Sequence, residues 1–185
     1  MLKLNKNDDK KIVSMQTNEG VFSFAYLVEP RPESDFKAGH YGTDFVIRDP
    51  ETLQAIKTYL NEVIEAAVLP SGAWEGKMPK ELLLPLKKGS DDQELTKGAY
   101  VLKTHTKHQP KVYIRNEAGR ALEVTPTEFD DIYSGMVGEI VIKLSAYSYG
   151  GNKGITAYIS AACKTGAGTP LGSKGNYEDD FSIAS

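Results

Sequence analysis

The chain has 185 residues, of which 40% are hydrophobic and 25% charged, and its formal net charge is −3. These are ordinary values for one globular domain, and no apolar run is long enough to cross a membrane. The polar start MLKLNKNDDKK predicts no signal peptide. Cys163 is the single cysteine, so no intrachain disulfide can form and we expect a soluble intracellular protein.

The charges are unevenly distributed. The last ten residues hold three acids and no base, and removing them leaves 22 acids against 22 bases in residues 1–175. Six bases and one acid lie between Lys97 and Arg120, whereas residues 121–142 hold five acids and no base. The basic block predicts a local positively charged surface on a domain that is neutral as a whole and is followed by an acidic tail.

The first third of the chain predicts two strands. Residues 1–11 are polar, and we expect them to be frayed. Residues 21–28 (VFSFAYLV) alternate as a strand does, and Pro30 and Pro32 end this strand because proline cannot donate to a ladder. One face of this strand carries Phe22, Phe24, Tyr26 and Val28. A shorter strand at 41–48 is expected to pair with it antiparallel.

One clear helix follows. Asp49 is placed as an N-cap and Pro50 at the first helical position. Apolar residues recur at helical spacing from Leu53 to Ala67, and Pro70 ends the run. The helix therefore spans about five turns and packs one apolar stripe on a sheet. A second, short helix is expected at 79–84.

The second half predicts strands at 98–106, 111–115, 136–149 and 154–164. The turns NEAG and GGN separate neighbouring strands, and a Gly-rich linker from 166 to 175 leads into the tail. In the longest strand the inward positions are Ile140, Ile142 and Leu144. In the last strand they are Ile155, Ala157, Ile159, Ala161 and Cys163.

Strands of this kind with one helix inserted midway indicate a mainly β protein. We expect a small, closed or partly open antiparallel barrel of five or six strands. A β-sandwich is the alternative architecture.

The sequence predicts no catalytic or metal centre. His40, His105, His108 and Cys163 lack the second ligand pair that structural zinc usually needs. Cys163 alternates with apolar residues and is expected to be a small buried side chain. Pro170 stands where a helix should follow the glycines of GAGTPLG and no helical pattern follows, which favours a linker over a nucleotide loop. We expect no enzyme, no cofactor and no metal.

The positive signal is the interleaving of bases and aromatic residues on the polar faces of the late strands. Cations that follow phosphates and aromatic faces that accept any base are typical of sequence-independent binding to single-stranded nucleic acid. The alternative is that these are common strand tyrosines and solubilising lysines.

The order of several motifs resembles a known family. FAYLVEPRP, YGTDFVI and DPETLQAIKTYL precede GAYVLKTHTKHQPKVYI and the long segment from IYSGMVG through GNKG to GTPLG. Together they resemble the single-stranded DNA-binding proteins of tailed bacteriophages. The resemblance implies an OB-fold that coats single-stranded DNA in replication and recombination, in the cytoplasm of the infected bacterium. It predicts an OB-fold DNA-binding domain at 1–175 and an acidic C-terminal tail, disordered in the family, at 176–185.

Positions on the predicted strands and loops suggest the individual DNA contacts. Predicted stacking platforms are Tyr113, Tyr147, Tyr149 and Tyr158, and the alternative for Tyr158 is a tyrosine that closes the barrel edge. Predicted phosphate partners are Lys103, Lys107, Lys111, Arg115, Lys143 and Lys153, with Arg31 and Lys37 as weaker candidates. Tail residues predicted to recruit replication proteins of the phage or host are Glu178, Asp179, Asp180 and Phe181. The sequence departs from the family in ending SIAS after Phe181. A homodimer is left open, and a phage structural or protein-interaction barrel without nucleic-acid binding is the alternative function.

Overall fold

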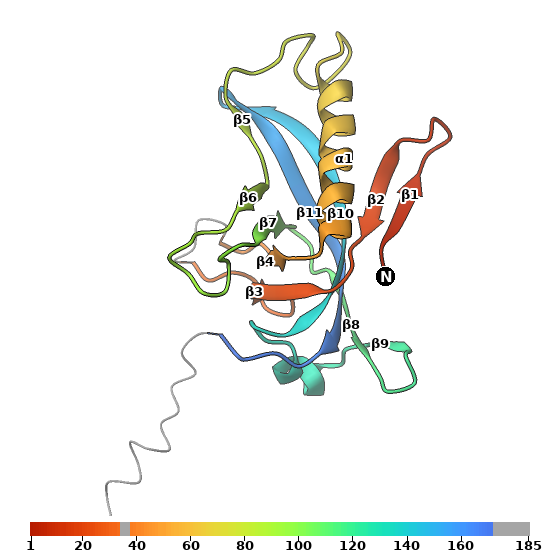
Figure 1. The fold of residues 1–185 in the computed structure, drawn as a ribbon, viewed down its shortest axis with the longest axis vertical. Helices are drawn as coiled ribbons and strands as arrows, with labels where there is room; N and C mark the ends of the chain where they lie inside the picture. Colours follow the sequence, from red (N-terminus) through yellow and green to blue (C-terminus); the bar gives the residue numbers. More distant parts are fainter. Residues whose placement is uncertain (34–37, 172–185) are drawn as a thin grey trace, which may run out of the picture.

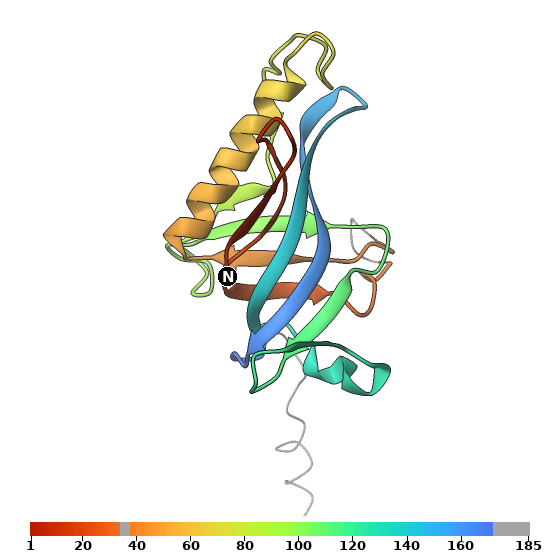
Figure 2. The ribbon, with the colours of Figure 1, turned by 90° about the vertical axis from the view of Figure 1, so that its right-hand side faces the viewer.

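The computed structural model describes residues 1–33 and 38–171. Its strands wrap into a barrel flanked by one long helix (Figures 1 and 2). The elements are β1 (Lys3–Lys6), β2 (Ile12–Gln16), β3 (Gly20–Tyr26), β4 (Gly42–Ile47), α1 (Pro50–Ala67), β5 (Leu82–Leu83), β6 (Leu86–Lys88), β7 (Tyr100–His105), β8 (Lys111–Arg115), β9 (Ala121–Glu123), a 3₁₀ helix (Pro126–Asp131), β10 (Val137–Tyr149) and β11 (Asn152–Gly166). No helix within the described ranges is long and apolar enough to span a membrane.

Five strands close into a ring. The sheet runs β10–β3–β4–β7–β11, and β11 pairs back onto β10. The β3–β4, β4–β7, β10–β11 and β10–β3 pairings are antiparallel, whereas β7 and β11 are parallel. This Greek-key closure is the OB-fold. The predicted mainly β barrel with one long helix is confirmed, and the parallel contact is a departure from a fully antiparallel barrel.

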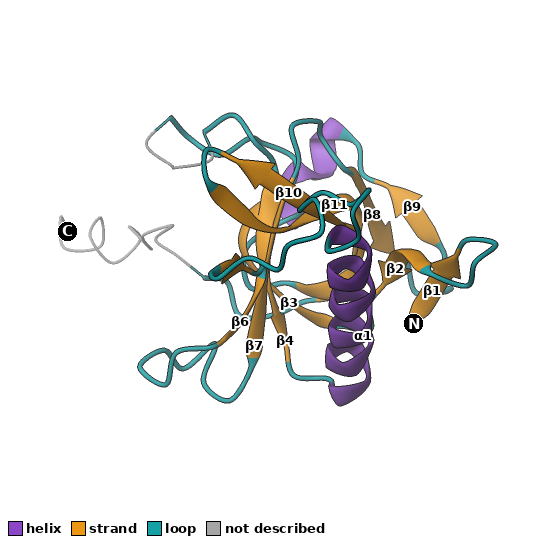
Figure 3. Cartoon of the chain, turned by 90° about the horizontal axis from the view of Figure 1, so that it is seen from above, coloured by secondary structure: helices purple, strands orange, loops and turns teal. Residues whose placement is uncertain are grey.

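The helix begins as its sequence predicts. The Asp49 carboxylate accepts a hydrogen bond from the Thr52 N–H at 2.8 Å, and Pro50 opens the first turn. Ile56 and Tyr59 are buried on the face that meets the barrel, and the Tyr59 hydroxyl accepts the Leu144 N–H at 3.2 Å. Seen from above, α1 lies along the outside of the ring (Figure 3). The helix therefore covers one side of the barrel.

Two segments differ from their predicted structure. Residues 1–11 are not frayed: β1 pairs antiparallel with β2, and Leu2 and Leu4 pack against the core. Residues 79–84 form no helix, because Leu82 and Leu83 pair with β11 as the two-residue strand β5. In the first segment the neighbouring hairpin strand satisfies the backbone, and in the second a strand far away in the sequence does so and overrides the local pattern.

The predicted strand at 21–28 is broken by a bulge. Its register against β4 shifts between Ser23 and Tyr26, and Phe24 has a φ of +47°. Phe22 is fully buried, in edge-to-face contact with Phe45 at 5.2 Å, but Phe24 is 57% exposed. A bulge turns the following side chain to the other face. Phe24 therefore does not share the core face with Phe22.

A second irregularity lies in the long hairpin. The register of β10 against β11 shifts between Val141 and Ile142, so that Ile142 faces Ile159 while Val141 faces Ala161. Beyond the shift Ala162 is buried, whereas Ala161 and Cys163 are half-buried. The inward-facing residues predicted for β11 are therefore correct up to Ile159. After Ile159 the buried position is one residue further along the chain than predicted.

Candidate nucleic-acid interface

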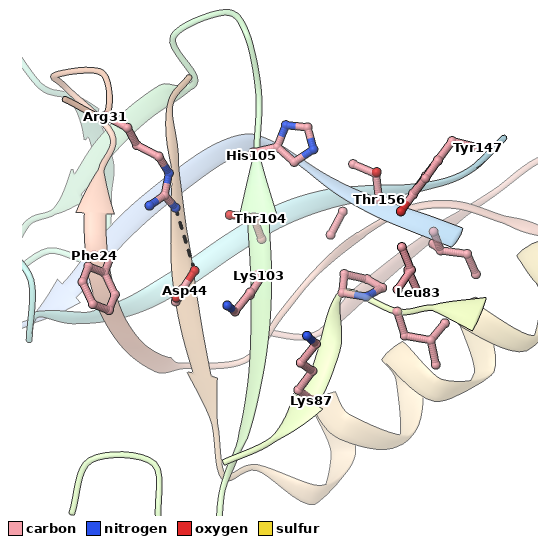
Figure 4. A pocket seen from close by; sticks show the side chains of 14 residues that line it. Phe24, Arg31, Asp44, Leu83, Lys87, Lys103, Thr104, His105, Tyr147 and Thr156 are labelled. Atoms are coloured by element: carbon pink, nitrogen blue, oxygen red, sulfur yellow. Dashed lines mark ion pairs between the residues drawn. The ribbon is translucent and has the colours of Figure 1, made fainter. Parts of the chain in front are cut away.

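A groove opens where the ladder on β11 is interrupted. β5 pairs with Lys153 and Gly154, and β7 pairs with Ala157 and Tyr158. The residues between them leave a hollow of about 590 Å³, which we call the basic groove (Figure 4). It is lined by Phe24, Arg31, Asp44, Leu83, Leu84, Pro85, Lys87, Lys103, Thr104, His105, Tyr147, Ile155, Thr156 and Ala157.

The lining holds three cations and one carboxylate. Lys103 follows buried Leu102 on β7, so the alternation of the strand points its side chain outward. Lys87 lies on the neighbouring β6 and is also exposed. The Arg31 guanidinium lies 3.8 Å from the Asp44 carboxylate. The net positive potential suits a polyanion, and Figure 4 shows both lysine ammonium groups on the same side of the groove.

Aromatic rings lie at both ends of the same groove. Phe24 stands at one end and Tyr147 at the other, with His105 between them (Figure 4). The ring centroids of His105 and Tyr158 are 5.4 Å apart, so Tyr158 extends this surface beyond the groove. Rings of this kind offer faces on which bases of any sequence can stack.

The backbone of Phe24 is strained. A positive φ is uncommon for residues other than glycine, and for a bulky side chain it is an outlier. Such strain costs on the order of 1–3 kcal/mol and clusters at functional sites. The ring is nevertheless presented to solvent at the edge of the basic groove. Phe24 is therefore not a core residue, and its strained backbone places the ring at the groove.

The predicted site residues fall into separate groups. Lys103 and Tyr147 line the basic groove. Lys143 and Tyr158 face each other across β10 and β11 on the outer face of the hairpin. Three further predicted residues are not part of the groove lining: Tyr149, which is 84% exposed, Lys153 at the hairpin tip and Lys107 in the β7–β8 loop.

Three predicted residues lie elsewhere, on β8. This strand pairs with the far part of β11, at Ala161 to Lys164, and none of its residues lines the basic groove. Lys111 forms an ion pair with Glu123 at 2.9 Å. Arg115 is bound to the buried Glu139 at 2.9 Å. Tyr113 lies between them on the same strand. Arg115 therefore has a structural partner, and all three residues lie outside the lining of the basic groove.

Glu139 is a buried carboxylate with several donors. Burial opposes its ionisation, but hydrogen bonds from the Met1 amino group, from Arg115 and from Gln16 outweigh this effect and hold the pKa of Glu139 below its ordinary value. The hydrogen bond to Glu139 in turn raises the pKa of Arg115. The contact between Arg115 and Glu139 thus links β8 to β10, outside the basic groove.

Replacing Glu139 by Gln should lower the free energy of unfolding by about 1–3 kcal/mol at pH 7, because charge-assisted hydrogen bonds are lost. A carboxyl whose pKa is depressed by folding stabilises above its ordinary pKa of about 4.3 and loses that effect as pH falls through its lowered value. The difference in free energy of unfolding between Glu139→Gln and the unmodified chain should therefore shrink below about pH 4. Urea denaturation of both chains at several pH values measures this difference.

Glu123→Gln is the matched control, since it breaks an ion pair whose two side chains are 66% and 56% exposed. It should change stability little at any pH. Equal effects of the two substitutions would show that Glu139 has no special role.

Metal ligands do not gather in the described part of the chain. No group of three or more His, Cys, Asp or Glu side chains there could hold an ion. His40 and His105 contact each other with their Nδ1 atoms 3.4 Å apart. Burial raises the pKa of the Cys163 thiol, which disfavours the reactive thiolate.

Sequence reasoning misses several lining residues. Alternation with Phe22 places Phe24 on the core face, because a simple period of two ignores the bulge. Lys87 lies in a three-residue strand too short to show a period, and Arg31 is only a weaker candidate. The predicted tail residues Glu178, Asp179, Asp180 and Phe181, the domain boundary at 175, and Lys37 lie outside the described residues.

The ring topology and the basic groove define an OB-fold protein. A family model described as "Enterobacter phage Enc34, ssDNA-binding protein" matches residues 13–185, and the chain belongs to this family. The predicted family is thereby confirmed.

Solved structures share the fold. The single-stranded DNA-binding protein from bacteriophage Enc34 in complex with ssDNA matches with a TM-score of 0.70 and 21% identity, covering 92% of this chain and 98% of that chain. The single-stranded DNA-binding protein gp2.5 encoded by bacteriophage T7 matches with a TM-score of 0.60 and 14% identity, over 87% of this chain and 96% of that chain. No protein of curated function matches this chain.

Proposed function

We propose that the chain binds single-stranded DNA without sequence preference, through the basic groove. The observation that carries the proposal is the pairing of exposed Lys87 and Lys103 with the rings of Phe24 and Tyr147 in one hollow. Lysines neutralise phosphates wherever the backbone passes, and the rings accept any base. Tyr158, Lys143, Tyr149, Lys153 and Lys107 extend the surface along and beside the hairpin.

Family membership supports the same function. A related protein of bacteriophage Enc34 has been solved in complex with ssDNA. By this relationship the chain coats and protects single-stranded DNA during phage replication and recombination, in the cytoplasm of the infected bacterium. The proposed role is binding alone, without catalysis or cofactor.

The acidic tail adds a second part to the proposal. Glu178, Asp179, Asp180 and Phe181 recruit replication or recombination proteins of the phage or host, and they compete with DNA for the basic groove. Contact of one chain's tail with another chain's groove would produce a homodimer. The sequence supports this part through the three adjacent acids and the absence of bases after residue 175.

The proposed function is tested by fluorescence anisotropy of labelled oligo-dT with the full chain over a salt series. We expect binding whose affinity falls as salt rises, since phosphate contacts release counterions. Unlabelled oligo-dA should compete within an order of magnitude. No binding at low salt would overturn the proposal and favour a structural or protein-interaction barrel.

A chain that ends at Gly175 tests the tail. It should bind oligo-dT more tightly than the full chain, and most clearly at low salt, because a competing polyanion is removed. Added as a free peptide, residues 176–185 should weaken binding by the truncated chain. Equal affinities of the two chains would contradict competition by the tail.

A further inference from the structure

A second groove lies on the other edge of the β10–β11 hairpin. It has a volume of about 840 Å³ and lies between the β1–β2 turn, the C-terminal half of α1 and residues 144–146 of β10. The described ladder between β2 and β10 consists of Gln16 with Val141 and Met15 with Ile142. Beyond this point the two strands diverge, and Figure 2 shows the β1–β2 hairpin between α1 and β10. We call this hollow the acidic groove.

The walls of the acidic groove are held in place by contacts within the chain. The Ile12 N–H donates to the Glu62 carboxylate at 2.7 Å and so ties the β1–β2 hairpin to α1. The turn itself is closed by the Lys11 N–H, which donates to the Asn7 side chain at 2.9 Å. A ligand therefore meets a formed site, and its binding costs little ordering entropy.

The chemistry of the acidic groove is opposite to that of the basic groove. Asp9, Glu62 and Glu65 contribute three carboxylates against the single ammonium of Lys11. Between them lie apolar side chains, of which Leu69 is 54% exposed. A DNA backbone and the acidic tail of this chain are both repelled by such a rim.

We propose that the acidic groove binds a segment of a partner protein that carries an apolar side chain flanked by lysine or arginine. The apolar side chain would cover Leu69, and the flanking cations would meet Asp9 and Glu65, an arrangement of apolar centre and charged rim that is usual in interfaces. The two grooves share no lining residue. The partner can therefore be held while DNA occupies the other groove.

The test uses the ¹⁵N-labelled full chain and a synthetic peptide, acetyl-KLKLK-amide, followed by amide chemical shifts. We expect shifts at Glu65, Leu69 and Leu144. The peptides KSKSK and ELELE, with the same blocked ends, should give none at these positions. Shifts confined to residues 176–185, or equal shifts with ELELE, would overturn the proposal.

Charge reversal at the rim sharpens the test. The double variant Asp9→Lys with Glu65→Lys should weaken KLKLK binding about tenfold or more, while Glu62 is kept because it holds the β1–β2 hairpin. Asp91→Lys with Glu117→Lys changes the net charge equally at exposed sites outside both grooves and should leave peptide binding unchanged. Equal weakening by both pairs would mean non-specific attraction and overturn the proposal.

Two further readouts identify the occupant of the acidic groove and keep the two grooves apart. Shifts at Leu69 and Leu144 that depend on protein concentration without peptide would assign the groove to a second copy of the chain, against the proposal. Oligo-dT binding is measured on the same samples. The proposed peptide binding does not depend on the proposed DNA binding. If the chain binds the peptide but not DNA, the DNA proposal fails. If it binds DNA but not the peptide, the peptide proposal fails.

Discussion

The substitution Phe24→Asn should weaken oligo-dT binding by about 5- to 150-fold, because a stacking ring contributes about 1–3 kcal/mol per base. The same substitution should leave stability unchanged or raise it slightly. Asparagine tolerates the left-handed backbone of this position, which phenylalanine adopts under strain. Anisotropy and urea denaturation on the same variant measure the two effects.

Two controls distinguish binding from packing. Phe24→Tyr keeps an aromatic face and should keep the affinity for oligo-dT. Phe22→Ala, in the fully buried neighbour, should lower the free energy of unfolding by about 3–5 kcal/mol without changing the affinity of the folded fraction. If Phe24→Asn destabilised the chain and left the affinity unaltered, Phe24 would be a packing residue.

The double variant Lys87→Ala with Lys103→Ala should weaken binding and flatten its salt dependence. Each phosphate contact with a single strand contributes a slope of about −0.7 in a plot of log affinity against log salt. Loss of both lysines should therefore reduce the slope by about 1.4. Titrations of labelled oligo-dT at four or more salt concentrations give the slope directly.

Lys111→Ala is the control of matched residue type. Its ammonium is paired with Glu123 on β8 and β9, outside the basic groove. We expect a salt slope close to that of the unmodified chain. A slope reduced by about 0.7 in Lys111→Ala, which is half the effect expected of the double variant, would move the DNA path onto β8.

The elements that the sequence predicted well are those whose signals are local. Helix α1 carries its own cap at Asp49, its own first-turn proline and a full apolar stripe. The alternation of β10 likewise identifies Ile140, Ile142 and Leu144 as core residues without knowledge of a partner. These patterns depend on backbone periodicity alone.

The elements it missed depend on distant partners. β5 has two residues and is a strand because β11 lies beside it. The exposure of Phe24 depends on a bulge whose register is set by β4. Among site residues, Lys103 and Tyr147 could be found from alternation. The ion pair between Arg115 and Glu139 could not be predicted, because these residues are 24 positions apart in the sequence.

The position of β11 in the ladder has a consequence for biosynthesis. This strand pairs with β5, β7, β8 and β10, and it follows all four in the described part of the chain. Until it has been synthesised, the barrel ring cannot close and one wall of the basic groove is missing. Assembly from such non-local pairings takes on the order of milliseconds to seconds. The basic groove is therefore complete only after β11 has joined the ring.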